Sequence, residues 1–297
     1  MSENLTNCPV CGKNDFSLFL ETSDFFLSRE AFSILQCRAC GFKFVNPRPG
    51  KTEIGRYYQS DEYISHDAKG GSLISRIYKL ARVFSIRFKY KIVINSVNPG
   101  KILDVGCGTG EFLKYCKSRG FDVSGVEPND KARTYAQQEN GIPVTPALSD
   151  IADGPANFSC ITMWHVLEHL HDLNEAIAIV KGRLLADGVF IVAVPNCNSW
   201  DALKYGKFWA AYDVPRHLYH FTESTIHILA EKHGFDIIQM HPQKLDAFYV
   251  SMLSEKYLAG RINYFKALFS GLRSNFMAGR QGRGHSSQIF VLSQKKA

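Results

Sequence analysis

The sequence predicts an α/β fold, in which a mostly parallel sheet carries helices on both faces and follows a small cysteine-rich domain. Segments with the apolar patterns of strands and helices alternate from residue 100 to residue 240. A glycine-rich turn at residues 106–110 follows the first of these strands, and two Cys-x-x-Cys-Gly pairs lie near the amino terminus. Alternation of this kind places parallel strands side by side and helices on both faces of the sheet.

The first predicted unit, residues 1–50, contains four of the eight cysteines, arranged as two Cys-x-x-Cys-Gly knuckles. Each knuckle aims two thiolates at one point, and two knuckles complete a tetrahedral zinc site. Between them, apolar residues at 16–20 and 32–36 follow strand spacing, as in a zinc ribbon. Four thiolates leave no open coordination position, so we expect a structural zinc ion and not a redox pair. The predicted ligands are Cys8, Cys11, Cys37 and Cys40.

The second predicted unit, residues 51–98, is a linker or lid that contains a basic amphipathic helix. Apolar residues recur at helical spacing between residues 72 and 95, and lysines and arginines occupy most of the remaining surface. Residues 69–94 carry seven positive charges and residues 256–297 carry eight, more together than the net charge of +7 of the 297-residue chain. The basic charge therefore lies in two patches, which suit an anionic partner.

The third predicted unit, residues 99–297, contains the sheet, with insertions on the substrate side at about 197–221 and 246–286. The last strand, residues 288–292, follows no helix closely and can enter the sheet antiparallel. The other predicted strands cover 101–105, 121–126, 160–164, 189–194 and 236–240, and the predicted helices cover 111–118, 131–139, 174–185 and 223–233.

The glycine-rich turn predicts a binding site for a nucleoside. Glycines between a strand and a helix let the backbone approach a ligand closely. Glu111 stands where a dinucleotide-binding loop has its third glycine, and a carboxylate there would repel a pyrophosphate at the helix start. The spacing therefore favours a nucleoside without phosphate. Glu127, at the end of the second strand, can accept hydrogen bonds from both hydroxyls of a ribose.

Three segments, ILDVGCGTGEFL, GVEPND and MWHVLEHL, resemble the signatures of class I S-adenosylmethionine-dependent methyltransferases. The resemblance covers about half the chain, residues 102–240, and implies a Rossmann-like sheet with S-adenosylmethionine as cofactor. It implies that the glycine turn faces the methionine part of the cofactor, that Leu148 or its neighbours flank adenine, and that the end of the fourth strand lies near the sulfonium. The implied cofactor residues are Asp104, Gly106, Gly108, Gly110, Glu127, Leu148, Trp164 and His165.

The insertion after the fifth strand contains the candidates for the methyl-acceptor site. Its segment PRHLYHF, residues 215–221, resembles a motif found in a branch of these methyltransferases. Histidine titrates near neutrality, so His217 or His220 can act as a base toward a hydroxyl, with His165 as a third candidate. Arg216 can hold an anionic group. For Glu168 and His169 we expect caps and buried hydrogen bonds at a helix entry.

These features together predict a methyltransferase that acts on a small molecule or glycan precursor, at an oxygen of a sugar or nucleotide-linked sugar. Zinc-ribbon methyltransferases that act on sugars resemble this layout. One alternative is an RNA methyltransferase with a zinc-binding amino-terminal domain, and another is a non-catalytic protein that binds the cofactor or a partner. The expected acceptor is anionic, and the aromatic and basic segment from 247 to 284 also suits the surface of a membrane. We expect a cytoplasmic protein without a transmembrane segment, because no apolar run approaches ~20 residues.

Overall fold

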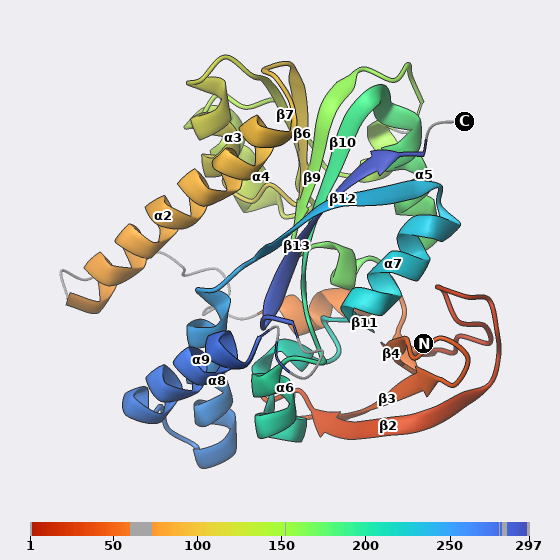
Figure 1. The fold of residues 1–297 in the computed structure, drawn as a ribbon, viewed down its shortest axis with the longest axis vertical. Coiled ribbons are helices and arrows are strands. Elements are labelled where there is room, and N and C mark those ends of the chain that lie inside the picture. The colour runs from red at the N-terminus through yellow and green to blue at the C-terminus, as the bar shows by residue number, and fades with distance from the viewer. Residues whose placement is uncertain (1, 60–72, 152, 279, 281–283, 296–297) are drawn as a thin grey trace.

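The computed structural model describes the chain except residues 1, 60–72, 152, 279, 281–283 and 296–297 (Figure 1). Its centre is a seven-stranded sheet in the order β12-β13-β10-β9-β6-β7-β8. No helix among the described residues is long and apolar enough to cross a membrane. The strands of this sheet are β6 (Lys101–Val105), β7 (Asp122–Val126), β8 (Val144–Thr145), β9 (Phe158–Trp164), β10 (Leu184–Pro195), β12 (Phe235–Pro242) and β13 (Ser287–Gln294).

The directions of the strands confirm the predicted mostly parallel sheet. Strands β8, β7, β6, β9 and β10 pair in parallel, and their carboxyl ends therefore share one edge. The last strand, β13, lies antiparallel between β10 and β12, as the sequence analysis allowed. The sheet order reverses beside β6, and the glycine turn leaves the sheet there. Ligands of open α/β sheets bind at such a reversal, outside the carboxyl ends of the strands.

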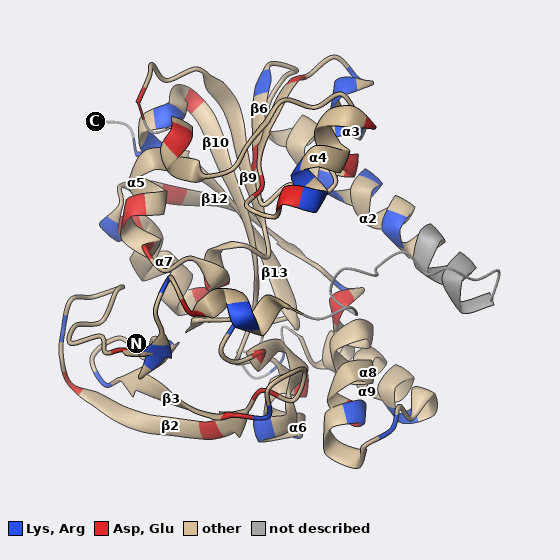
Figure 2. Ribbon diagram, turned by 180° about the vertical axis from the view of Figure 1, so that it is seen from behind, with Lys and Arg blue, Asp and Glu red and all other residues tan. Residues whose placement is uncertain are grey.

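Helices cover both faces of the sheet (Figures 1 and 2). One face packs against α2, α3 and α4, through buried apolar residues such as Val93, Leu113 and Ala136. The other face packs against α5 and α7, through residues such as Ile177 and Leu229. These helices are α2 (Leu73–Ser96), α3 (Glu111–Lys117), α4 (Asp130–Gln138), α5 (Leu173–Arg183) and α7 (Glu223–Lys232).

A second sheet, in the order β11-β4-β3-β2, contains the amino-terminal residues and one strand from far along the chain. Strand β11 belongs to the segment PRHLYHF, and its Tyr219 pairs with Phe44 of β4. The hydrogen bonds of this sheet therefore cross the predicted boundary near residue 50. The strands are β2 (Phe16–Ser23), β3 (Ala31–Cys37), β4 (Lys43–Val45) and β11 (Tyr219–His220), and a two-stranded pair joins β1 (Ser2–Glu3) to β5 (Arg48–Pro49).

Short helices from the two insertions cover the carboxyl edge of the main sheet. Helices α8 and α9 pack against each other and against α6. Asp201 of α6 is fully buried and accepts hydrogen bonds from Trp209, Ser274 and Ser286, which joins both insertions to the start of β13. The elements are α6 (Trp200–Tyr205), α8 (Asp246–Ala259) and α9 (Tyr264–Met277), with short 3-10 helices η1 (Ile54–Tyr58), η2 (Leu148–Ile151), η3 (Leu167–His169), η4 (Gly206–Phe208) and η5 (Ala210–Tyr212).

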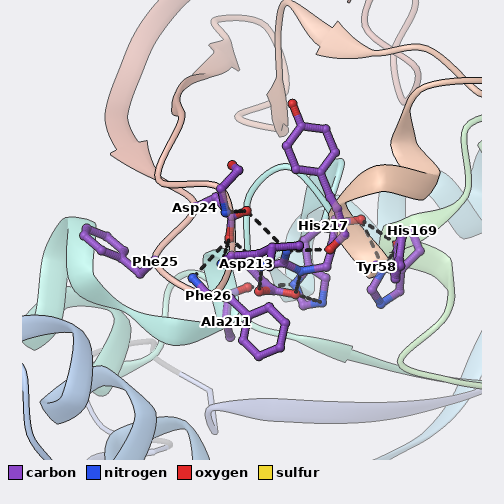
Figure 3. Close-up of polar contacts among 12 residues, drawn as sticks. Asp24, Phe25, Phe26, Tyr58, His169, Ala211, Asp213 and His217 are labelled. Atoms are coloured by element: carbon purple, nitrogen blue, oxygen red, sulfur yellow. Dashed lines mark hydrogen bonds and ion pairs between the residues drawn. The ribbon is translucent and has the colours of Figure 1, made fainter. Parts of the chain in front are cut away.

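A buried guanidinium connects the second sheet to the insertion after β10. The side chain of Arg216 is 1% exposed and pairs with Asp24 at 2.8 Å and with Asp213 at 2.7 Å. It also donates to the carbonyl of Tyr57, so its donors are occupied by the protein itself. The expectation that Arg216 holds an anionic ligand is therefore wrong, because Asp24 and Asp213 already neutralise it. Figure 3 shows these two carboxylates approaching each other from separate segments.

We expect Asp24→Ala to lower the free energy of unfolding by about 3 to 5 kcal/mol, because it removes one carboxylate from a buried charge network. Asp24 also accepts backbone N–H groups of Phe26, Leu27 and Ser28, so its loss releases the turn after β2. Urea unfolding measures the change. Asp122→Ala, which removes an exposed carboxylate from β7, is the matched control. Equal unfolding midpoints for the two variants would contradict the role given to Arg216.

Candidate active site

The glycine turn after β6 has a backbone that side chains would obstruct. Gly106, Gly108 and Gly110 all have positive φ, at 73°, 55° and 76°. A Cβ on Gly106 would lie 2.4 Å from a methyl carbon of Val166, so only glycine fits beside β9. A Cβ on Gly108 would meet no atom of the described residues within 4 Å, so those residues leave open space above that part of the turn.

Glu127, which follows β7, holds the turn in place. Its Oε2 accepts the backbone N–H of Gly108 at 2.8 Å, and its Oε1 accepts that of Asn129 at 2.9 Å. Because β6, β7, β8 and β9 are neighbours, their carboxyl ends bring together Gly106–Gly110, Glu127, Leu148 and the Trp164–His165 pair. The structure therefore places the residues assigned to the cofactor along one edge of the sheet.

Asp104 lies beneath this turn in an apolar environment. Its side chain accepts the hydroxyl hydrogen of Thr162 at 2.6 Å. Burial raises the pKa of Asp104 to about 7, although the Thr162 hydrogen bond and the nearby Lys89 act in the opposite direction. Lys89 reaches the site from α2, with Nζ 4.8 Å from the centre of a Trp164 ring. No feature of the sequence distinguishes Lys89 from the other lysines of the basic helix.

His165 follows β9 and lies between two carboxylates. Its φ is 57°, its Nε2 is 3.0 Å from Asp246 of α8, and its Nδ1 is 3.4 Å from Glu168. These two carboxylates raise the pKa of His165 to about 10 despite burial. The imidazole therefore carries its proton at neutral pH and is unsuited to be the base that the sequence analysis considered. Asp246 lies 81 residues from His165 in the sequence, so no local pattern could have indicated the pair.

The other two candidate bases occupy different environments. His220, in β11, is buried against the ring of Tyr212 and does not line the cavity described below. Burial lowers the pKa of His220 well below its ordinary value. It is therefore badly placed to contact an acceptor. His217 lines that cavity, and its Nδ1 bonds the carbonyl of Ala211 at 2.8 Å. Of the two, only His217 stays a candidate for the acceptor site.

A cavity of about 580 Å³ opens beside His165 and His217. Three segments that are remote in sequence form most of its wall: the turn after β2, the insertion after β10, and α8. Phe25 from the turn stacks on Tyr257 from α8, with ring centres 5.4 Å apart. Arg29 and Lys256 also line the cavity, and neither forms an ion pair with a carboxylate of the described residues. The cavity thus combines aromatic walls with two available cations.

The four amino-terminal cysteines lie in one cluster away from this cavity. Their sulfur atoms lie within 4.8 Å of one another, and the Cys8–Cys40 and Cys11–Cys37 pairs are 3.6 Å and 3.5 Å apart. Gly12 and Gly41, which follow the two knuckles, both have φ of 75°. Four thiols at this separation are the donor set and spacing of a tetrahedral zinc site, to which each would contribute as a thiolate.

Comparisons with known proteins agree with this geometry. A family model described as a methyltransferase domain matches residues 78–240. The ubiquinone biosynthesis O-methyltransferase of Actinobacillus pleuropneumoniae serotype 7 is 27% identical over 171 residues, which cover 53% of this chain and 72% of that protein. Other curated relatives of the same description are covered over 52% and 47% of their length, so the chain spans about half to three quarters of these relatives.

Two solved structures share the fold. Magnesium protoporphyrin IX methyltransferase from Synechocystis PCC 6803, solved with bound S-adenosylhomocysteine, has a TM-score of 0.54 at 15% identity, covering 83% of this chain and all of that one. The 1,6-didemethyltoxoflavin-N1-methyltransferase of Burkholderia thailandensis has a TM-score of 0.52 at 16% identity, covering 91% of this chain and 98% of that one. Structural similarity at such low sequence identity establishes the shared fold.

We expect Asp104 to make stability depend on pH. Its pKa is raised by burial, so between about pH 4 and about pH 7 the folded protein holds a proton that the unfolded chain has released. This contribution is complete below about pH 4 and is lost as the pH rises through about 7. The free energy of unfolding of the wild type, minus that of Asp104→Asn, should fall by about 3 kcal/mol from about pH 5 to about pH 8.

Urea unfolding at several pH values measures this difference, in which effects common to both proteins cancel. Asp122→Asn alters an exposed carboxylate of the neighbouring strand, and the difference in unfolding free energy between the wild type and this variant should not change with pH. Parallel pH profiles for the wild type and Asp104→Asn would show that the Asp104 carboxyl titrates normally.

Proposed function

The chain belongs to the methyltransferase domain family, and from that premise we propose that it methylates an oxygen of a small anionic acceptor, a sugar or nucleotide-linked sugar, with S-adenosylmethionine as donor. The observation that carries this proposal is the 580 Å³ cavity, which lies beside the end of β9 and holds two cations without carboxylate partners among the described residues. The name O-methyltransferase on the curated relatives supports oxygen as the methylated atom.

The residues at the carboxyl edge of the sheet fit the cofactor. When bound, S-adenosylmethionine supplies an electrophilic methyl group on a sulfonium. We assign its ribose to Glu127, its methionine part to the turn of Gly106, Gly108 and Gly110 with Asp104 beneath, and its adenine to the vicinity of Leu148. The indole N–H of Trp164 is buried and has no hydrogen-bond partner among the described residues. Together with Nζ of Lys89 it offers two donors to a carboxylate at that end of the site.

The cavity suits a phosphorylated acceptor. Among the described residues, Arg29 donates one bond, to the carbonyl of Phe25, and its other donors and the ammonium of Lys256 remain available. Two cations from different segments of the cavity wall can bind a phosphate or diphosphate. The stacked rings of Phe25 and Tyr257 provide an aromatic wall for a sugar or base. Charge and shape together favour a nucleotide-linked sugar over a neutral one.

The reaction needs the acceptor held in line with the methyl group. S-adenosylmethionine, held by the residues named above, would supply its methyl group to the acceptor oxygen and leave as S-adenosylhomocysteine, and the hydroxyl proton would pass to water. Protonated His165, held by Asp246 and Glu168, lies where the cavity meets the end of β9. Its ring nitrogens lie 3.0 Å from Asp246 and 3.4 Å from Glu168, so we assign it a positioning role.

We assign zinc to Cys8, Cys11, Cys37 and Cys40, as a structural ion. Both knuckles lie at the end of the second sheet, whose turn after β2 forms one wall of the cavity. A zinc ion bound by four thiolates would stabilise this domain and would leave no coordination position for a substrate. In this proposal residues 1–50 form the zinc domain, 51–98 the basic linker, and 99–297 the domain that binds cofactor.

We expect Glu127→Ala to weaken binding of S-adenosylhomocysteine by about 1 to 3 kcal/mol, because ribose hydroxyls would lose a charged acceptor. Isothermal titration calorimetry measures the change. Glu139→Ala, which removes an exposed carboxylate just after α4, is the control. Unchanged affinity in Glu127→Ala would contradict the assignment of the ribose to Glu127. A lack of binding by the wild type would contradict S-adenosylmethionine as the methyl donor.

We expect nucleoside diphosphate sugars, and not neutral sugars, to raise the melting temperature of protein saturated with S-adenosylhomocysteine. The double variant Arg29→Ala/Lys256→Ala should weaken this binding about tenfold or more, since charged hydrogen bonds contribute about 1.5 to 3 kcal/mol each. Lys131→Ala, on exposed α4, is the control. Equal binding by the double variant, or a preference for neutral sugars, would contradict an anionic acceptor. Mass spectrometry of the methylated product then tests for a methyl group on oxygen.

A further inference from the structure

A second cluster of metal-binding side chains lies beside the cavity. It contains Glu168 and His169 from η3 and His217 from the insertion after β10, and one ligand atom of each lies within 4.8 Å of the others. The rings of His169 and His217 are nearly perpendicular, with centres 4.6 Å apart. Figure 3 shows the two histidines side by side, although they come from two separate segments of the chain. The proposed function gives this cluster no role.

Both imidazoles bond a carbonyl oxygen through Nδ1, which leaves Nε2 for a ligand, and Nε2 of His217 lies 4.0 Å from Asp213 Oδ2. His169 Nδ1 lies 3.0 Å from the carbonyl oxygen of Arg216, and His217 Nδ1 lies 2.8 Å from that of Ala211. His169 Nδ1 also lies 2.9 Å from the hydroxyl of Tyr58, which donates its own hydrogen to the Arg216 carbonyl and can accept from Nδ1. A carbonyl only accepts, so each Nδ1 carries the hydrogen and each neutral ring has its lone pair on Nε2. Histidine ligands of metal ions are commonly held in this way, with the second nitrogen donating to a carbonyl or carboxylate.

The carboxylate of Glu168 is the observation that calls for a ligand. Its side chain is 0% exposed, and both oxygens lack a hydrogen-bond partner among the residues that the structure describes. The nearest cationic atom, His165 Nδ1, is 3.4 Å from Oε1 and outside hydrogen-bond geometry. The expected buried hydrogen bonds at this position are therefore missing for Glu168. Protonated His165 supplies a positive charge nearby, but no donor of the described residues contacts either oxygen, and a metal ion would provide that contact.

We propose that Glu168, His169 and His217 bind a divalent first-row transition-metal ion. Two imidazole nitrogens and one carboxylate oxygen form a donor set that favours zinc, manganese, iron or cobalt over magnesium or calcium. Bonds of about 2.1 Å allow two ligands to be at most ~4.2 Å apart, so side-chain shifts of less than ~1 Å close the cluster around an ion. Three protein ligands leave coordination positions open.

The location of the cluster links it to the acceptor. His217 lines the cavity, so an ion at its Nε2 has an open position toward an acceptor hydroxyl. A bound ion of this kind lowers the pKa of a coordinated oxygen. This use rests on the proposed function, whereas the site itself does not.

The test is a titration of the full-length, zinc-loaded protein with Mn²⁺, followed by electron paramagnetic resonance. Thiolates select zinc over manganese, so Mn²⁺ reports the second cluster and not the cysteines. We expect one Mn²⁺ per chain, with a spin-echo modulation from histidine nitrogens. Glu168→Gln, His169→Ala and His217→Ala should each weaken Mn²⁺ binding at least tenfold, and the two histidine variants should alter the nitrogen modulation.

The control is His227→Ala, which removes an exposed histidine from α7 and should bind Mn²⁺ as the wild type does. One zinc per chain and an unchanged circular dichroism spectrum establish that each variant is folded. Two results for the wild type alone would overturn the proposal: no binding at millimolar Mn²⁺, or bound Mn²⁺ without nitrogen coupling. Mn²⁺ binding without methyl transfer would uphold the metal site and reject only the proposed function.

Discussion

The buried guanidinium of Arg216 fixes the positions of three segments that the chain keeps far apart. Asp24 comes from the amino-terminal sheet, the carbonyl of Tyr57 from η1, and Asp213 from the insertion after β10. Because a buried charge must keep its partners, these segments cannot separate without a large cost in free energy. The neighbours of this network, Phe25 and His217, line the cavity. Arg216 and Asp213 line it as well, so the shape of the acceptor site depends directly on this ion pair.

The two halves of the site are built in different ways. The cofactor half uses the turns after neighbouring parallel strands, so the sheet itself sets the distance between Gly108 and Glu127. The acceptor half combines the turn after β2, the insertion after β10 and α8, none of which belongs to the main sheet. A change in those three segments can alter the acceptor without altering the sheet. This division is consistent with one fold serving methyltransferases with different substrates.

The same division explains which parts of the fold and of the site could be predicted from the sequence. Glycine spacing and strand periodicity are local signals, and they were sufficient for the sheet, its helices and the glycine turn. The roles of Arg216 and His165 depend on Asp24 and Asp246, which lie 192 and 81 residues away. A residue's type indicates that it can carry charge, but only tertiary contacts decide which charge neutralises it. Arg216 was therefore misassigned to a ligand, and His165 to a base.

The pairing of β11 with β4 also sets an order of events during synthesis. Residues 43–45 leave the ribosome long before residues 219–220, which complete their sheet. At about 5 to 20 residues per second, the interval is roughly 10 to 35 s. Throughout it, β4 presents an unpaired edge to other nascent chains, as any truncated form ending before β11 would do permanently. The amino-terminal domain is thus the first to be made and among the last to be finished.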